Sequence, residues 1–151
     1  YLAAMAEAVL MQEGTIDKYM GDAIMAWFNA PVPQPDHTLR AVKTALAIRA
    51  SVENLYKELS QDAHLAFGVG IHYGDAILGL IGTEKRLEYT AISDSVNTAK
   101  RIQENSDKNQ ILISKAACER VKKQVEAKPC AEMKLKGKEH PLEVFEVLGM
   151  K

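Results

Sequence analysis

The chain has 151 residues, 47% of them hydrophobic and 26% charged, which is ordinary for one soluble globular domain with a core of its own. A net charge of −1 and an aromatic content of 6% do not supply the basic face and stacking aromatics of a nucleic-acid-binding domain, so no nucleic-acid partner is expected. The sequence contains no apolar run near the roughly 20 residues of a membrane span, and its two cysteines favour a reduced, cytoplasmic setting over a disulfide framework.

The first expected elements are a helix and a hairpin. Residues 1–13 are rich in alanine and predict a helix. Strand-like residues 15–20 and 23–28 flank Gly21-Asp22, and a glycine at the first loop position favours a type II′ turn between two strands.

A rigid loop and a long helix come next. Three prolines occupy residues 29–36, and apolar residues then recur at helical spacing over 37–59. Asp36 stands where it can cap this helix.

The remaining elements alternate between strands and helices. In chain order they are strands at 64–74, 75–82 and 86–92, a helix from Ser93 or Asp94 to Glu104, a strand at 110–114, a helix at 115–122, and strands near 131–135 and 142–148. Mixed helices and hairpin-connected strands predict an α+β fold, with a ferredoxin-like split βαβ core and a mostly antiparallel sheet with flanking helices. We expect residues 1–151 to form one domain.

Two charged residues of the first hairpin are candidates for a site. The carboxylate of Asp22 projects freely from the tip and suits a metal ion, although aspartate is common in tight turns for its backbone tolerance alone. Lys18 has the strand parity of Ile16 and Met20, so it either reaches a ligand or extends its stem along apolar surface.

The second half of the chain adds polar candidates. Asn97 and Arg101 lie four residues apart, hence on one helix face, where an amide and a guanidinium suit ribose and phosphate, or form a solvated face. Thr90 lies on the preceding strand, and strand threonines are common. Lys136, in the turn "KLKGKEHP", either contacts a triphosphate or belongs to a polar loop.

The order and spacing of these segments are more specific than any one of them. "IDKYMGDAIMAWF", "GVGIHYGDAILGLIG", "LEYTAISDSVNTAKRI" and "KLKGKE" together resemble the class III nucleotidyl cyclase catalytic domain over essentially the whole chain. The most specific parts are the Lys-x-x-Gly-Asp hairpin and the run in which six residues separate Thr90 from Asn97 and three separate Asn97 from Arg101.

The resemblance implies a reaction and the residues that perform it. In this family the ribose 3′-hydroxyl attacks the α-phosphorus of a nucleoside triphosphate and pyrophosphate leaves, assisted by two divalent ions, Mg²⁺ or Mn²⁺. Asp22 matches the second of two metal-binding aspartates, and the first would lie in a strand upstream of residue 1. Asn97 matches the residue that orients the ribose, Arg101 the arginine that stabilises charge at the α-phosphate, and Lys136 the lysine that contacts the triphosphate.

The resemblance also implies a base preference. Lys18 and Thr90 match the pair that selects the base, and Ile92 matches a position beside it. Lysine donates to adenine N1 and the threonine hydroxyl can accept from the exocyclic amine, whereas guanine reverses both edges. The expected substrate is therefore ATP and the expected activity is that of an adenylate cyclase.

In this family the sites lie between two domains packed head to tail, so Lys18 and Asp22 of one chain would serve different sites. We expect a homodimer with two equivalent sites. Threonine at position 90 resembles a branch of bacterial and soluble animal enzymes that often respond to bicarbonate, and such domains usually follow upstream sensor modules. The alternatives are a guanylate cyclase and a cyclase-homology module that only dimerises or regulates.

Overall fold

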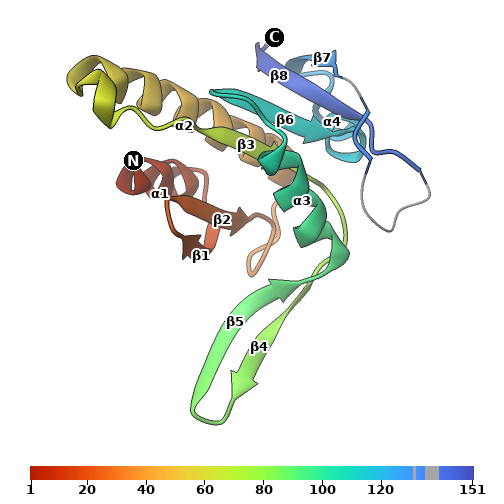
Figure 1. The fold of residues 1–151 in the computed structure, drawn as a ribbon. Helices are drawn as coiled ribbons and strands as arrows, with labels where there is room; N and C mark the ends of the chain where they lie inside the picture. The colour runs from red at the N-terminus through yellow and green to blue at the C-terminus, as the bar shows by residue number, and fades with distance from the viewer. Residues whose placement is uncertain (131, 135–139) are drawn as a thin grey trace.

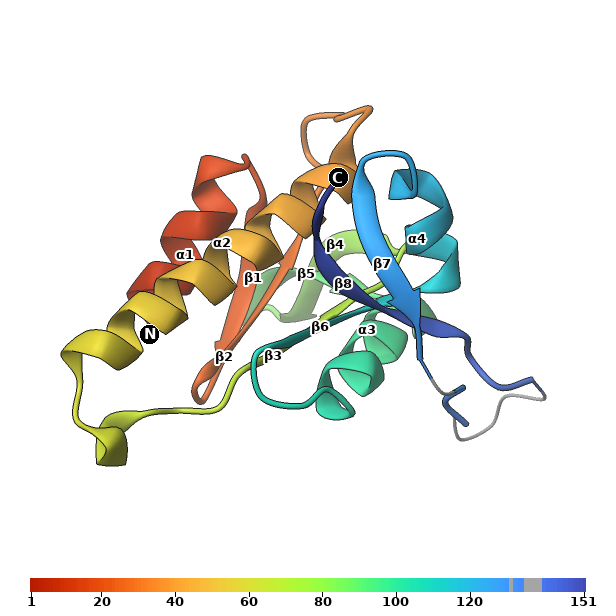
Figure 2. The same cartoon turned by 90° about the horizontal axis from the view of Figure 1, so that it is seen from above.

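The computed structural model describes residues 1–130, 132–134 and 140–151 (Figures 1 and 2). In chain order its helices and strands are α1 (Leu2–Met11), β1 (Thr15–Met20), β2 (Ala23–Trp27), α2 (His37–Glu58), a 3₁₀ turn at Gln61–Ala63, β3 (Gly68–Ile71), β4 (Ile77–Thr83), β5 (Arg86–Ile92), α3 (Asp94–Glu104), β6 (Gln110–Ser114), α4 (Lys115–Val121), β7 (Val125–Pro129) and β8 (Val144–Met150). Among these residues, none of the helices combines the length and apolarity that crossing a membrane requires.

A four-stranded sheet with the order β3-β6-β8-β7 forms the centre of the fold. β3 and β6 are parallel, with α3 on the connection between them, while β8 runs antiparallel to both β6 and β7. The fold is α+β, built from this split βαβ core and antiparallel hairpins, as the sequence predicts.

The sheet is covered on both faces because successive residues of β6 point to opposite sides. Ile111 and Ile113 pack in the cluster that contains residues of α2 and α4. Leu112, between them, packs instead with Ile102 of α3 and Val144 of β8. The run "QILIS" is therefore apolar on both faces, as a fully covered strand requires.

The N-terminal part packs against α2. Met5 and Ala8 of α1 share a buried cluster with Ile48 and Val52 of α2, and the two helices lie side by side (Figure 2). The β1–β2 hairpin follows α1 and forms a separate two-stranded sheet. Gly21 turns the hairpin with a φ of +62°, the left-handed value expected at the first loop position.

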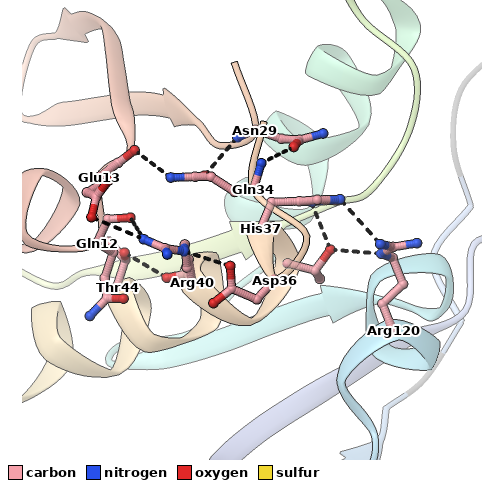
Figure 3. Close-up of polar contacts among 10 residues, drawn as sticks. Gln12, Glu13, Asn29, Gln34, Asp36, His37, Arg40, Thr44 and Arg120 are labelled. Carbon is pink, nitrogen blue, oxygen red and sulfur yellow. Dashed lines mark hydrogen bonds and ion pairs between the residues drawn. The ribbon is translucent and has the colours of Figure 1, made fainter. Parts of the chain in front are cut away.

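A polar network anchors the start of α2 to its neighbours (Figure 3). Gln34 is buried and donates to the Glu13 carbonyl oxygen at 3.0 Å, while its backbone N–H donates to the side chain of Asn29 at 2.6 Å. Arg40 donates to Asp36 at 2.8 Å and to the Gln12 carbonyl oxygen at 3.2 Å. Asp36 is the N-cap residue of α2, as expected, but its carboxylate pairs with Arg40 and does not accept from the helix backbone.

The β4–β5 hairpin projects from the rest of the molecule (Figure 1). Its antiparallel register runs from Ile77↔Ile92 to Thr83↔Arg86. Six large apolar side chains of this arm are exposed, namely Ile77, Leu80, Ile81, Leu87, Tyr89 and Ile92.

Two expected strands are placed differently by the structure. The strand expected at 64–74 is confined to β3, because residues 64–67 and 72–74 have no ladder partner within the described residues. The strand expected near 131–135 is wrong for the part that is described, where Met133 makes only an isolated bridge with Leu142. The partner of β8 is β7, "VEAKP", whose charged residues masked its strand character.

Candidate functional site

The candidate site begins with a bulge in β1. The pairing with β2 passes from Ile16↔Ala26 directly to Lys18↔Met25, which leaves Asp17 as an extra residue. A bulge breaks the two-residue alternation of a strand and re-aims side chains. The parity argument that placed Lys18 with Ile16 therefore does not hold across the bulge, although Lys18 and Met20 remain in regular pairing.

The structure brings Lys18 and Thr90 together around one carboxylate oxygen. The Thr90 hydroxyl donates to Asp17 Oδ2 at 3.0 Å, and Lys18 Nζ lies 3.8 Å from the same oxygen. The Asp17 side chain is 2% exposed and Thr90 is buried, whereas the Lys18 side chain is 44% exposed. Two residues 72 positions apart thus bring a buried hydroxyl and a partly exposed ammonium group to the same carboxylate oxygen.

The β1–β2 hairpin and β5 lie next to each other, which makes this contact possible. The rings of Trp27 on β2 and Tyr89 on β5 are 6.2 Å apart in an edge-to-face arrangement. Aromatic pairs of this geometry stabilise packing by about 1 kcal/mol beyond their buried area.

Asn97 and Arg101 lie on the exposed face of α3. Ser93 caps the helix by accepting from the Val96 backbone N–H at 3.2 Å, so the register of Asn97 and Arg101 is fixed from the first turn. Both residues are exposed, and Arg101 makes an ion pair with Glu104 at 3.4 Å. Another side of the helix buries Ile102, which is fully inaccessible to solvent.

Close packing onto β3 fixes the position of α3. A Cβ atom at Gly70 would lie 2.4 Å from the backbone nitrogen of Gln103 and 2.6 Å from the carbonyl oxygen of Ala99. These are backbone atoms that cannot rotate away, so only glycine permits this approach. The exposed amide and guanidinium are therefore carried by a helix that is held firmly against the central sheet.

The other expected site residues lie elsewhere. Asp22 is exposed at the hairpin tip, and within the described residues no hydrogen bond or ion pair joins it to another site residue. Ile92 ends β5 with 52% of its surface exposed, immediately before the α3 cap. Lys136 lies outside the described residues.

The described residues offer few ligands for a metal ion. In the described part of the chain, there is no group of three or more histidine, cysteine, aspartate or glutamate side chains that could hold a metal ion. Asp22 offers one free carboxylate, which is not a complete coordination site. The described residues thus fit a divalent metal only as the source of one ligand.

Asp17 is the residue of this site that sequence analysis missed. A charged residue between Ile16 and the candidate Lys18 was visible in the sequence, but the bulge that turns it toward Thr90 was not. Regular strand alternation without the bulge would put Asp17 and Lys18 on opposite faces of the hairpin.

Comparison with known proteins gives the family. The model of the adenylate and guanylate cyclase catalytic domain matches residues 9–148. The chain belongs to this family. The cyclase domain is 34% identical to adenylate cyclase 1 of Rhizobium meliloti, with 99% of this chain and 23% of that protein covered. The chain therefore spans about a quarter of the length of this relative.

Solved structures agree with the family. The cyclase domain superposes on the guanylyl cyclase Cya2 with a TM-score of 0.93 at 31% identity, covering 100% of this chain and 78% of that one. The adenylyl cyclase CyaB from P. aeruginosa gives a TM-score of 0.91 at 27% identity, with coverage of 100% and 80%. Adenylyl and guanylyl cyclases thus share this fold, so the fold alone does not distinguish ATP from GTP as the substrate.

Proposed function

We propose that this domain is an adenylate cyclase that converts ATP to 3′,5′-cyclic AMP and pyrophosphate. The observation that carries the proposal is the convergence of Lys18 and Thr90 on Asp17, because these two positions match the base-selecting pair. The ammonium donates to adenine N1, and the hydroxyl oxygen accepts from the exocyclic amine. Guanine would place its N1–H against a cation, and the unpaired donor would weaken binding. The exposed Ile92 would contact the base from the end of β5.

The reaction is an intramolecular displacement at the α-phosphorus. The 3′-oxygen forms the new P–O bond and loses its proton, and the bond between the α-phosphorus and the bridging oxygen of pyrophosphate breaks. In our proposal Asn97 holds the ribose, and Arg101 stabilises the charge that develops on the α-phosphate. Lys136 would bind the triphosphate.

The proposed cofactor is a pair of Mg²⁺ or Mn²⁺ ions at each site, with Asp22 as one ligand. Bound divalent ions would lower the pKa of the attacking hydroxyl and offset charge on the phosphates. Asp22 matches the second of the two metal-binding aspartates that the family resemblance implies. No step is assigned to the metals, because Asp22 alone does not form a coordination site.

The proposed assembly is a head-to-tail homodimer with two sites. Its support is the β4–β5 arm, which exposes six large apolar side chains. An apolar surface of this kind marks an association site. In such a dimer Asp22 of one protomer would meet Lys18, Thr90, Asn97 and Arg101 of its partner, so a monomer would be inactive.

The first experiment uses the full-length protein with Mn²⁺ and either ATP or GTP, followed by chromatographic identification of products, with Asp22→Ala as the matched variant. We expect cyclic AMP from ATP, little product from GTP, and loss of product in the variant. A folded dimer that forms no cyclic nucleotide would support the alternative of a non-catalytic regulatory module.

A second candidate function is that of a guanylate cyclase, which the 31% identity to the guanylyl cyclase Cya2 favours. Preferential formation of cyclic GMP from GTP in the same experiment would support it. The proposed bicarbonate response is tested separately, and rates that stay flat when bicarbonate varies at fixed pH would exclude it.

A cytoplasmic location is also proposed, in keeping with two free cysteines among the described residues.

A further inference from the structure

Asp17 has no role in the function proposed above, although it lies at the centre of the base-selecting pair. Its side chain is 2% exposed, and aspartate is rarely buried to this extent unless it is paired. A bulge in β1 delivers it to this position. Bulges beside active sites commonly re-aim a side chain that has a task there.

Thr90 by itself does not discriminate between adenine and guanine. A threonine hydroxyl has one hydrogen to donate and two lone pairs that accept. A freely rotating hydroxyl could accept from the adenine amine or donate to O6 of guanine. Adenine, with an amine that donates, and guanine, with an O6 that accepts, would therefore both form a hydrogen bond with Thr90.

The contact with Asp17 removes this ambiguity. An ionised carboxylate only accepts hydrogen bonds. Thr90 Oγ1 donates its single hydrogen to Asp17 Oδ2 at 3.0 Å, so only lone pairs remain for a ligand. The Lys18 ammonium is 3.8 Å from the same oxygen, beyond ordinary hydrogen-bond length, and its hydrogens remain available to a base.

We propose that Asp17 is a positioning residue for base specificity, which fixes the Thr90 hydroxyl as a hydrogen-bond acceptor and so favours adenine over guanine. The proposal rests on the proposed function, because it assigns the contact with the base to Thr90. Asp17 itself does not contact the substrate.

The test replaces Asp17 by asparagine in the full-length protein. The side-chain amide can donate to Thr90 Oγ1, which frees the hydroxyl hydrogen to point at a base. For ATP, GTP and ITP we would measure both kcat/KM and equilibrium binding. ITP presents the N1–H and O6 of guanine without its 2-amino group, so it isolates the edge that Thr90 and Lys18 would read.

We expect Asp17→Asn to raise the GTP:ATP and ITP:ATP ratios of kcat/KM and of affinity by about tenfold, the value of one well-made hydrogen bond. Asp17→Ala also frees the hydroxyl and should shift the ratios in the same direction. Glu126→Gln is the matched control, since Glu126 is also an acidic residue at a strand bulge but is exposed on β7. Its ratios should equal those of the wild type.

The decisive comparison is made in a Thr90→Val background. Because Asp17 acts through the hydroxyl, Asp17→Asn should not change the ratios once the hydroxyl is gone. Equal shifts of the ratios with and without the Thr90 hydroxyl, or no shift in the wild-type background, would overturn the proposal. A general loss of stability would lower kcat/KM and affinity for all three nucleotides together and would leave the ratios unchanged, which also counts against the proposal.

The two proposals can fail separately. Wild-type preference for ATP and formation of cyclic AMP test the proposed function, while the response of the ratios to Asp17→Asn tests the role of Asp17. If the wild type binds nucleotides without cyclising them, the affinity ratios still decide the role of Asp17. A wild type that binds none of the three nucleotides overturns both.

Discussion

Arg101 belongs to the proposed chemistry and contributes little to holding the fold. Its side chain is 59% exposed, and its ion pair with Glu104 joins two solvated groups. Pairs of this kind contribute roughly 0–1 kcal/mol to stability. A change at Arg101 can therefore separate catalysis from folding.

We expect Arg101→Lys to lower kcat by about 100-fold or more, because lysine cannot reproduce the planar donors of a guanidinium at a developing phosphate charge. The free energy of unfolding should change by less than about 0.5 kcal/mol. Steady-state kinetics and urea denaturation measure the two effects. Glu104→Gln is the control and should leave kcat within about twofold, since it removes only the exposed partner.

His37 gives the fold a defined dependence on pH. Burial lowers the pKa of His37 below its usual value of 6.5, and the nearby charge of Arg120 lowers it further, partly opposed by Asp36. The ring stacks on Tyr73, with centroids 5.5 Å apart, and Arg120 lies 3.3 Å from His37 Nε2 (Figure 3). The folded state therefore favours neutral His37.

The sign of the effect follows from linkage. Above pH 6.5 the imidazole is neutral in both states, and as the pH falls through 6.5 the unfolded chain takes up the proton first. Unfolding free energy should therefore decrease as the pH is lowered from 6.5, and His37→Gln should make that decrease shallower. Urea unfolding at several pH values measures both slopes, and identical slopes would contradict the assignment.

At the residue scale, the sequence predicts most members of the candidate site but not the contact among Asp17, Lys18 and Thr90. The sequence singles out Lys18, Thr90, Asn97 and Arg101 because their spacing along the chain matches the motifs of the family. Asp17 is not singled out, because an extra residue in a strand is defined by its pairing with another strand, which no local pattern records.

At the scale of elements, the contact between α3 and β3 decides the position of α3, the helix that carries Asn97 and Arg101. We expect Gly70→Ala to lower the free energy of unfolding by about 1–3 kcal/mol, since the added methyl group would meet the backbone at Ala99 and Gln103. Urea denaturation measures this, and an unchanged midpoint would contradict it. The control is Gly79→Ala in β4, where no heavy atom lies within 4 Å of the added carbon.

Activity should respond in parallel with that packing. Relief of these contacts would move α3 and displace Asn97 and Arg101 together, so Gly70→Ala should also reduce kcat in the fraction that remains folded. The element itself was predictable from sequence, through Ser93 as a cap and Ile102 on the buried face. Its close approach to β3 was not, because a glycine in a strand does not reveal which backbone comes near it.

The strands show the same division. The strand β6 was predictable because "QILIS" is short, apolar and β-branched. The strand β7 was not, because "VEAKP" is defined by its pairing with β8 and carries charges on its exposed positions.

At the scale of the whole molecule, the proposed shared site makes a prediction about mixtures. Asp22→Ala and Arg101→Ala should each be inactive as homodimers. When the two variants are mixed and exchange protomers, each heterodimer should contain one intact site, so activity should recover to about a quarter of the wild-type value. No recovery, despite exchange shown by differently tagged protomers, would contradict the head-to-tail arrangement.

The arm offers an independent test of association. Leu80→Glu and Leu87→Glu place charges among the exposed apolar side chains of β4 and β5. These changes should leave the free energy of unfolding of a monomer nearly unchanged, but they should weaken association into a dimer that buries the arm. We expect sedimentation velocity to show folded monomers without activity. A full-strength dimer with either change would place the interface elsewhere.

The arm is also joined directly to the helix that carries Asn97 and Arg101. Ile92 ends β5 and Asp94 begins α3, and the single residue between them, Ser93, is held by its own hydrogen bond to the first turn. Because the connection is so short, a change in the direction of the hairpin would be transmitted to the start of α3. A partner bound at the far end of the arm would therefore also influence the orientation of α3. In the proposed enzyme, the strength of association and the rate of turnover would then be coupled through this connection.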